Sequence, residues 1–202
     1  MDTKAVFIGM DLGTYKTSVA SSTGVRDVIP TAIGRPRDAV ARTLLGRDVV
    51  FGNDLVQHRL ALDILRPFER GQLKYTSPGE AGVNHQQESA CKEAARQIVA
   101  HAVSLTRPPK GVPIYGVIGA PSRASVINKK VLLEAAHETF DGVMIISEPF
   151  SIAYGMNRLH DTLVVDIGAG TIDICPVYGI FPSEDEQGTV SAGGDLIDET
   201  FL

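Results

Sequence analysis

Two short turns in the sequence carry residue types that could bind a phosphate. The first is DLGT, residues 11–14, and the second is DIGAGT, residues 166–171. In both, an aspartate precedes a glycine by two positions and a threonine ends the motif. Each follows an apolar stretch and leads into another strand-like stretch, which is typical of a β-hairpin. One such turn is usually only turn chemistry, but a second copy far along the chain favours a shared role.

The chemistry of these residues gives a reason for the pairing. Glycine lacks a Cβ, so the backbone N–H groups of the turn can approach phosphate oxygens closely. A carboxylate that faces a polyanion repels it unless a cation lies between them, and Mg²⁺ accepts one or two carboxylates beside substrate phosphates. We therefore expect the two turns to face each other and to hold a metal–triphosphate between Asp11 and Asp166.

The first turn does not satisfy the spacing of a P-loop. In GMDLGTYKT the two glycines are one residue too close, and Lys16 is separated from Gly13 by two residues. The following TSVASS, residues 17–22, is rich in small and β-branched residues and predicts a strand, whereas a P-loop opens a helix. Lys16 is then either a phosphate ligand or a solvated strand residue, and we favour the second interpretation.

Composition excludes several classes of protein. The chain has 202 residues, 44% of them hydrophobic and 21% charged, which suits one or two globular domains. The net charge is −5 and no basic run exceeds Lys129–Lys130, so nucleic acid is not an expected partner. Cys91 and Cys175 lack metal-ligand spacing and indicate a reduced cytosolic chain. No apolar run approaches the roughly 20 residues of a transmembrane segment.

Strand and helix patterns alternate along the chain, which predicts an α/β fold with mixed sheets. Strands are expected over residues 4–10, 16–20, 25–31, 114–120, 142–147, 161–168 and 171–178, and helices over 86–105, 122–140 and after Pro149. Residues 34–71 are dense in Arg and Asp and predict a small inserted subdomain. The last segment, GGDLIDETFL, begins a helix and stops at Leu202 without a cap, so we expect a C-terminally truncated chain.

Several stretches besides the two turns resemble the actin, sugar kinase and chaperone ATPase superfamily. They are GAPSRASVINKKVLLEAA (119–136), SEPFSIAYG (147–155) and VSAGGDLIDETF (190–201), in the same order and at similar spacing. Residues 38–54, 61–71, 117–129 and 164–175 further resemble the bacterial actins whose filaments align magnetosomes.

The resemblance implies the α/β actin-like (ribonuclease H-like) ATPase fold, with mixed sheets flanked by helices. The first domain would comprise residues 1–33 and 72–141, with the insert at 34–71, and residues 142–202 would begin an incomplete second domain. Because the superfamily's adenosine-binding loop lies later in the second domain, we expect weak nucleotide binding and uncovered apolar faces.

The resemblance also assigns roles to individual residues. Asp11 and Asp166 match the metal-facing carboxylates, and Glu148 matches a glutamate near the metal and the attacking water, although it could merely support a helix N-terminus. Asn128 stands where other members carry Gln or Glu. An amide cannot accept a proton, so Asn128 would only orient water. Phosphate-loop positions are Gly13, Thr14, Gly168, Ala169, Gly170 and Thr171, and the catalytic set is Glu148, Asp166 and Asn128.

Asp173 matches an acidic position after the second loop, and an alternative is that it lines the polar face of its strand. As a whole, the resemblance implies a cytoplasmic ATPase that uses ATP and Mg²⁺ and polymerises with itself, with magnetosome-associated proteins as further partners. Three alternatives stay open: the ATPase domain of a DnaK-type chaperone, a small-molecule kinase, for which we find no carboxylate base, and an inactive remnant.

Overall fold

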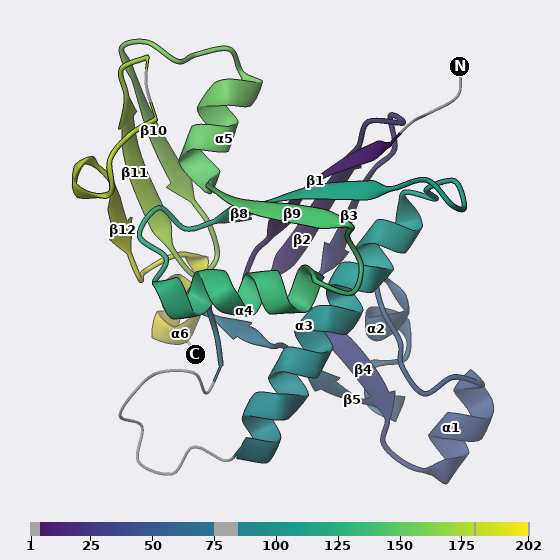
Figure 1. The fold of residues 1–202 in the computed structure, drawn as a ribbon. Coiled ribbons are helices and arrows are strands. Elements are labelled where there is room, and N and C mark those ends of the chain that lie inside the picture. The colour runs from purple at the N-terminus through teal and green to yellow at the C-terminus, as the bar shows by residue number, and fades with distance from the viewer. Residues whose placement is uncertain (1–4, 75–84, 180, 202) are drawn as a thin grey trace.

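The computed structural model describes residues 5–74, 85–179 and 181–201 of the chain. A five-stranded sheet has the order β3-β2-β1-β8-β9 (Figure 1). Its strands are β1 Val6–Leu12, β2 Lys16–Ser21, β3 Arg26–Pro30, β8 Ile114–Ala120 and β9 Gly142–Ser147. β1, β2 and β3 pair antiparallel, whereas β8 runs parallel to both β1 and β9. The sheet is therefore mixed, as predicted.

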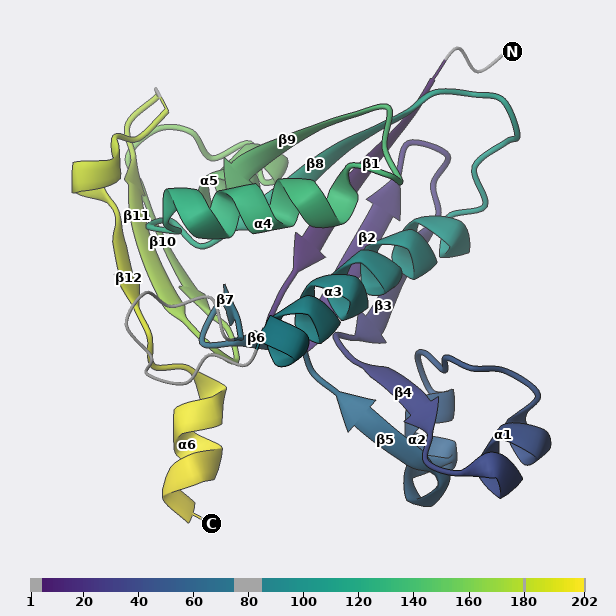
Figure 2. The same cartoon turned by 60° about the horizontal axis from the view of Figure 1, so that its bottom comes forward.

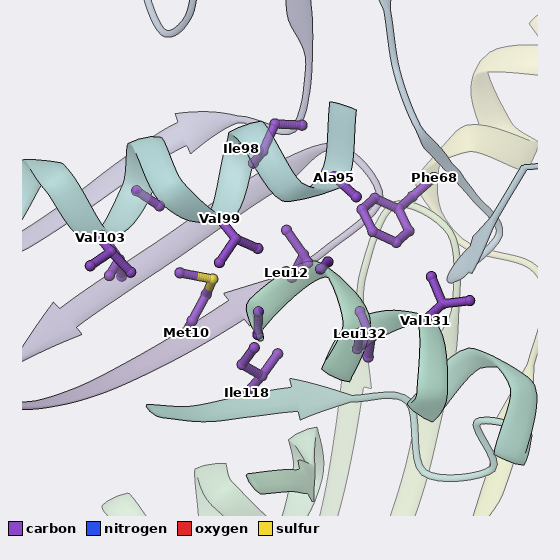
Figure 3. Packing of buried hydrophobic residues seen from close by; sticks show 14 of the residues in the cluster. Met10, Leu12, Phe68, Ala95, Ile98, Val99, Val103, Ile118, Val131 and Leu132 are labelled. Carbon is purple, nitrogen blue, oxygen red and sulfur yellow. The ribbon is translucent and has the colours of Figure 1, made fainter. Parts of the chain in front are cut away.

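Two helices, α3 (His85–Leu105) and α4 (Val126–Ala136), cover one face of this sheet (Figure 2). Alternate residues of β1 are buried, and Met10 and Leu12 lie with Ile98 and Val99 of α3 and with Leu132 of α4 in one apolar cluster (Figure 3). Burial of this cluster fixes which face of the sheet carries the helices and which face is left for other groups.

Helix α4 is shorter than the helix expected over residues 122–140. It begins at Val126 because the Ser125 side chain accepts a hydrogen bond from the Asn128 N–H at 3.2 Å and caps the helix. Val126, in the first turn of the helix, is 81% exposed. Phe140 follows the end of the helix and is buried.

A second sheet has the order β10-β11-β12 and is antiparallel. Its strands are β10 Thr162–Ile167, β11 Ile172–Val177 and β12 Gly188–Val190, and β12 was not predicted. Helix α5 (Glu148–Gly155) packs against it, η2 (Glu184–Glu186) precedes β12, and α6 (Gly194–Phe201) follows. We expected the second domain to start at residue 142, where β9 begins. In the structure, β9 is hydrogen-bonded to β8 and so belongs to the first sheet.

The insert has its own small core and then returns to the main body. It contains β4 Ile33–Pro36, α1 Ala39–Leu45, α2 Asp54–Gln57, η1 Arg59–Ala61 and β5 Leu62–Leu65. Ala32, Val50, Leu55 and Leu62 form the core. The hairpin of β6 (Phe68–Glu69) and β7 (Gln72–Leu73) follows, and its Phe68 and Leu73 are buried in the main cluster. Phe68, which we had assigned to the insert, thus packs with the main core.

Apolar side chains remain exposed on the sheet face opposite α3 and α4. Phe7, Tyr115 and Met144 are among them, and Phe7 is 59% exposed. The second sheet similarly exposes Leu163 and Ile167. Uncovered apolar faces of this kind were expected from the sequence. Within the described residues, no helix combines the length and hydropathy needed to cross a membrane.

Candidate functional site

The two turns singled out in the sequence form equivalent hairpins. The first joins β1 to β2, and the N–H of Gly13 donates to the carbonyl of Lys16 at 3.2 Å. The second joins β10 to β11, and the N–H of Gly168 donates to the carbonyl of Thr171 at 2.9 Å. A strand follows the first turn, so the structure agrees with the rejection of a P-loop. A Cβ on Gly13 would lie 2.9 Å from the Lys16 oxygen, which explains the glycine.

Both turns open into one cavity of about 580 Å³. Every site residue predicted from the sequence lines it: Asp11, Gly13, Thr14, Asn128, Glu148, Asp166, Gly168, Ala169, Gly170 and Thr171. Lys16, which we had favoured as a solvated residue, also lines this cavity and is exposed to its solvent. The expected juxtaposition of Asp11 and Asp166 in one crevice is therefore present.

The β6–β7 turn reaches the same cavity, which sequence reasoning did not anticipate. The N–H of Gly71 donates to the Thr14 hydroxyl at 3.0 Å, and Gly71 has a φ of 72°. Gly170 contacts the same group: a Cβ there would meet the Thr14 hydroxyl and lie 2.8 Å from the Gly71 nitrogen. The two hairpins and this turn thus touch one another around Thr14. In the sequence, the glycine after Arg70 is the one feature that points to a turn here, and it does not reveal what the turn contacts.

Backbone donors are exposed at the tips of both hairpins. Within the described chain, the turn amides that donate to no backbone carbonyl are those of Thr14, Tyr15, Ala169, Gly170 and Thr171. The carbonyls of the second turn are held by the start of α6, since Gly194 N–H donates to Gly168 at 3.1 Å and Asp195 N–H to Ala169 at 2.9 Å. Successive unpaired N–H groups in a fixed turn are suited to an anion.

Three carboxyl groups crowd the cavity and resist ionisation. Burial raises the pKa of Asp11 to about 6, and the neighbouring Asp166 adds to the effect. Burial raises the pKa of Glu148 to about 8, with further contributions from Asp11, Asp173 and Asp166. The pKa of Asp166 is raised as well, first by burial and then by Asp173, its partner across the β10–β11 ladder. A cation among these groups would favour their charged forms.

The carboxyl groups of the cavity suit a metal ion that takes most of its ligands from water and substrate phosphates. Among the described residues, no group of three or more His, Cys, Asp or Glu side chains is arranged to hold a metal ion by itself. Mg²⁺ commonly binds through one or two carboxylates and completes its shell with water and substrate phosphates. The pair of Asp11 and Asp166, beside unpaired turn amides, fits that requirement.

Glu148 and Asn128 approach the cavity from two helices. Glu148 is the first residue of α5, and its side chain lies over β8, where a Cβ on Gly119 would be 2.8 Å from the Glu148 Cγ. Asn128 lies in the first turn of α4 and is 8% exposed. Its amide can donate and accept hydrogen bonds but cannot act as a base.

Asp173 neither lines this cavity nor lies on an exposed strand face. It is 1% exposed, and its Oδ1 accepts hydrogen bonds from the Ser122 N–H at 2.7 Å and from the Thr189 hydroxyl at 2.5 Å. Asp173 therefore ties β11 and β12 to the segment that leads into α4. One interpretation of the sequence was that Asp173 lines the polar face of its strand. In the structure, its side chain is buried and hydrogen-bonded to two other segments.

Comparison with known proteins gives consistent relatives, although no protein-family model matches the chain. The chain is 38% identical to the actin-like protein MamK of Paramagnetospirillum magneticum over 194 residues, which are 96% of this chain and 53% of that protein. It is 37% identical to MamK of Magnetospirillum gryphiswaldense, over 96% of this chain and 51% of the relative. The chain thus spans about half the length of these relatives.

Comparison with solved structures also finds actin-like proteins. A MamK double helical filament matches with a TM-score of 0.86 at 37% identity, over 96% of this chain and 57% of that chain. A non-polymerising MamK mutant bound to AMPPNP matches with a TM-score of 0.75 at 37% identity, over 97% and 57%. MreB5 of Spiroplasma citri bound to ADP shares the fold, with a TM-score of 0.71 at 17% identity over 96% of this chain and 54% of that one.

Proposed function

Because this chain is a homologue of the MamK actin-like proteins and has their fold, we propose that it binds ATP with Mg²⁺ between its two hairpins and takes part in ATP hydrolysis. The observation that carries the proposal is the position of Asp11 and Asp166, which occupy matching places in the two glycine turns and line one cavity. The AMPPNP-bound MamK structure supports the choice of nucleotide.

The residues divide into two groups by what they can offer a triphosphate. The turn amides of Thr14, Tyr15, Ala169, Gly170 and Thr171, the Thr14 and Thr171 hydroxyls and the Lys16 ammonium can donate to phosphate oxygens. Asp11 and Asp166 would hold Mg²⁺, which when bound neutralises phosphate charge and polarises the phosphoryl group.

Glu148 and Asn128 are the groups that can position an attacking water. Phosphoryl transfer depends mainly on orientation and charge stabilisation, so an amide at Asn128 is compatible with slow hydrolysis. With a pKa of about 8 in the absence of a cation, Glu148 is largely protonated at neutral pH. A bound Mg²⁺ would lower that pKa and allow the carboxylate to accept a hydrogen bond from water.

The proposal extends to self-assembly. One of the similar structures is a MamK filament, so we propose that the chain belongs to a protein that polymerises into cytoplasmic filaments and organises magnetosomes together with magnetosome-associated proteins. None of the similar proteins named above is a chaperone or a small-molecule kinase.

Calorimetric titration with ATP tests nucleotide binding directly. We expect binding in the presence of Mg²⁺, little binding in EDTA, and an affinity at least about tenfold lower in Asp11→Asn and in Asp166→Asn, since each removes a charged ligand of the cation. Asp185→Asn, which alters an exposed carboxylate in η2 outside the cavity, is the matched control. Binding that needs no metal, or that survives in both site variants, would refute the proposal. Sedimentation of the protein with ATP and Mg²⁺ tests polymerisation.

A further inference from the structure

A second cavity, of about 720 Å³, is lined by residues of the insert and of the main body, and Tyr15 lines both this cavity and the first. Four basic residues line it: Arg37, Arg59, Arg66 and Lys74. Of the described residues that line it, none is acidic. The first cavity carries three carboxyl groups, so the two neighbouring cavities have opposite electrostatic character.

Arg66 is the most constrained of the four basic residues. Its guanidinium carbon lies 4.5 Å from the centre of the Tyr15 ring, which places the cation over the aromatic face. Its Nη1 atom is buried and has no hydrogen-bond partner among the described residues. A buried donor without an acceptor is unfavourable, because its desolvation is not compensated. A ligand with an anionic oxygen would supply the missing acceptor.

Nearby carboxylates compensate only part of this positive charge. Arg37 pairs with Asp63 at 3.7 Å and Lys74 with Glu69 at 3.9 Å, and both pairs are long and partly solvated. Within the described chain, Arg59 forms no ion pair. Burial raises the pKa of Asp195, and its acidic neighbours raise it further. The charge of Arg66 lowers that pKa only in part.

We propose that this cavity is a second anion site, which binds a small phosphorylated molecule with an apolar portion. Arginine presents a planar set of donors that matches phosphate oxygens. The apolar wall that includes Leu55, Leu62 and Leu65 would receive the rest of the ligand. The volume lies within the usual range of small-molecule sites, which combine apolar walls with a few polar groups.

The opposite charges of the two cavities distinguish this site from the proposed ATP site. Without a divalent cation, a polyanion is repelled by the carboxylates of Asp11 and Asp166 in the first cavity but attracted by the arginines of the second. Because Tyr15 lines both cavities and stacks on Arg66, an anion bound to Arg66 would also fix the first hairpin. Occupation of the second site would therefore change the affinity of the first.

The test is calorimetric titration of the protein with inorganic tripolyphosphate in EDTA. We expect metal-independent binding that weakens about tenfold in Arg59→Gln and in Arg66→Gln, since each loses a charge-assisted hydrogen bond. Arg59 is exposed on the short η1, so its variant avoids the packing of Arg66 on Tyr15. Arg158→Gln, which removes an exposed arginine outside the cavity, is the matched control and should bind as wild type does.

A second arm tests the apolar portion, since phenyl phosphate should bind more tightly than inorganic phosphate under the same conditions. Absence of metal-independent binding, or an equal loss in the Arg158→Gln control, would overturn the proposal. Binding that requires Mg²⁺ and disappears in Asp166→Asn would place the ligand in the first cavity, which overturns this proposal but supports the proposed function. Retained tripolyphosphate binding in Asp166→Asn supports a separate site.

Discussion

Lys16 and Thr171 occupy the same position in the two hairpin turns: the carbonyl of each accepts a hydrogen bond from the glycine three residues before it. The backbone geometry of the two turns is thereby matched, whereas their side chains differ. One turn contributes an ammonium group to the shared cavity and the other a hydroxyl. A phosphate between them would be approached by a full charge from one side and by a neutral donor from the other.

Replacement of Lys16 by glutamine tests whether this ammonium binds phosphate. We expect the affinity for ATP with Mg²⁺ to fall about tenfold, because a charge-assisted hydrogen bond is lost. Lys110→Gln, in an exposed loop outside the cavity, should leave the affinity unchanged. Titration of both variants measures the difference, and an unchanged affinity in Lys16→Gln would support the interpretation of Lys16 as a solvated strand residue.

The contact of Gly170 with Thr14 and Gly71 leads to a prediction about stability. In Gly170→Ala the added Cβ would lie 2.8 Å from the Gly71 nitrogen and 2.9 Å from the Arg70 Cα, so backbone atoms must move. We expect the free energy of unfolding to fall by about 1–3 kcal/mol, the usual cost of overpacking.

Gly155→Ala is the matched control for this change. Gly155 ends helix α5 and an added Cβ would meet nothing within 4 Å, so alanine should be neutral or slightly stabilising. Denaturant unfolding of the three proteins provides the comparison. Equal stability of both variants would mean that the two hairpins and the β6–β7 turn do not touch in solution.

The sequence predicted the two turns better than it predicted the elements that pack on them. The two turns were recognisable because Asp, Gly and Thr recur in fixed order between strand-like stretches, and hairpins are governed by local residue preferences. The contact of Gly71 with Thr14 could not be predicted in this way, since the two residues lie 57 positions apart. Local patterns carry no information about which distant turn packs on a given hairpin.

The helices and strands also show that local sequence patterns predict some elements well and others poorly. Helix α3 was expected from residue 86 to 105 and spans His85–Leu105, because its apolar positions recur at helical spacing and prolines follow. The pairing of β9 with β8 was not predicted, since a short apolar stretch reveals burial but not its partner strand. Strand β12 has three residues and lacks any periodic pattern.

Asp173 provides a test of the anchor that holds the entrance to α4. In Asp173→Ala the buried Ser122 N–H loses its acceptor, so we expect a loss of about 1–3 kcal/mol in unfolding free energy. Asp173→Asn keeps a carbonyl oxygen that can accept from Ser122, so it should lose less. Urea denaturation distinguishes the two variants, and an equal loss in both would assign the effect to the charge of Asp173 instead of its hydrogen bond.

The raised pKa of Glu148 predicts that the metal-free protein loses stability as pH rises. A glutamate with a pKa of 4.5 in the unfolded chain and about 8 in the fold binds its proton more tightly when folded. Its contribution is therefore fully favourable below about pH 4.5 and is lost progressively as the pH approaches 8. Asp11, with a pKa of about 6 in the fold, acts in the same direction at lower pH.

Glu148→Gln removes this ionisation while keeping a neutral side chain of the same shape. We expect the variant to gain thermal stability relative to wild type, with a difference that is small at pH 5 and largest near pH 8, because only wild type must ionise a buried carboxyl group. For Glu134→Gln, which alters an exposed carboxylate on α4, the difference in thermal stability from wild type should not increase between pH 5 and pH 8. Thermal unfolding in EDTA measures both. A constant difference between pH 5 and pH 8 would show that Glu148 ionises normally and that the three carboxyl groups are not crowded in solution.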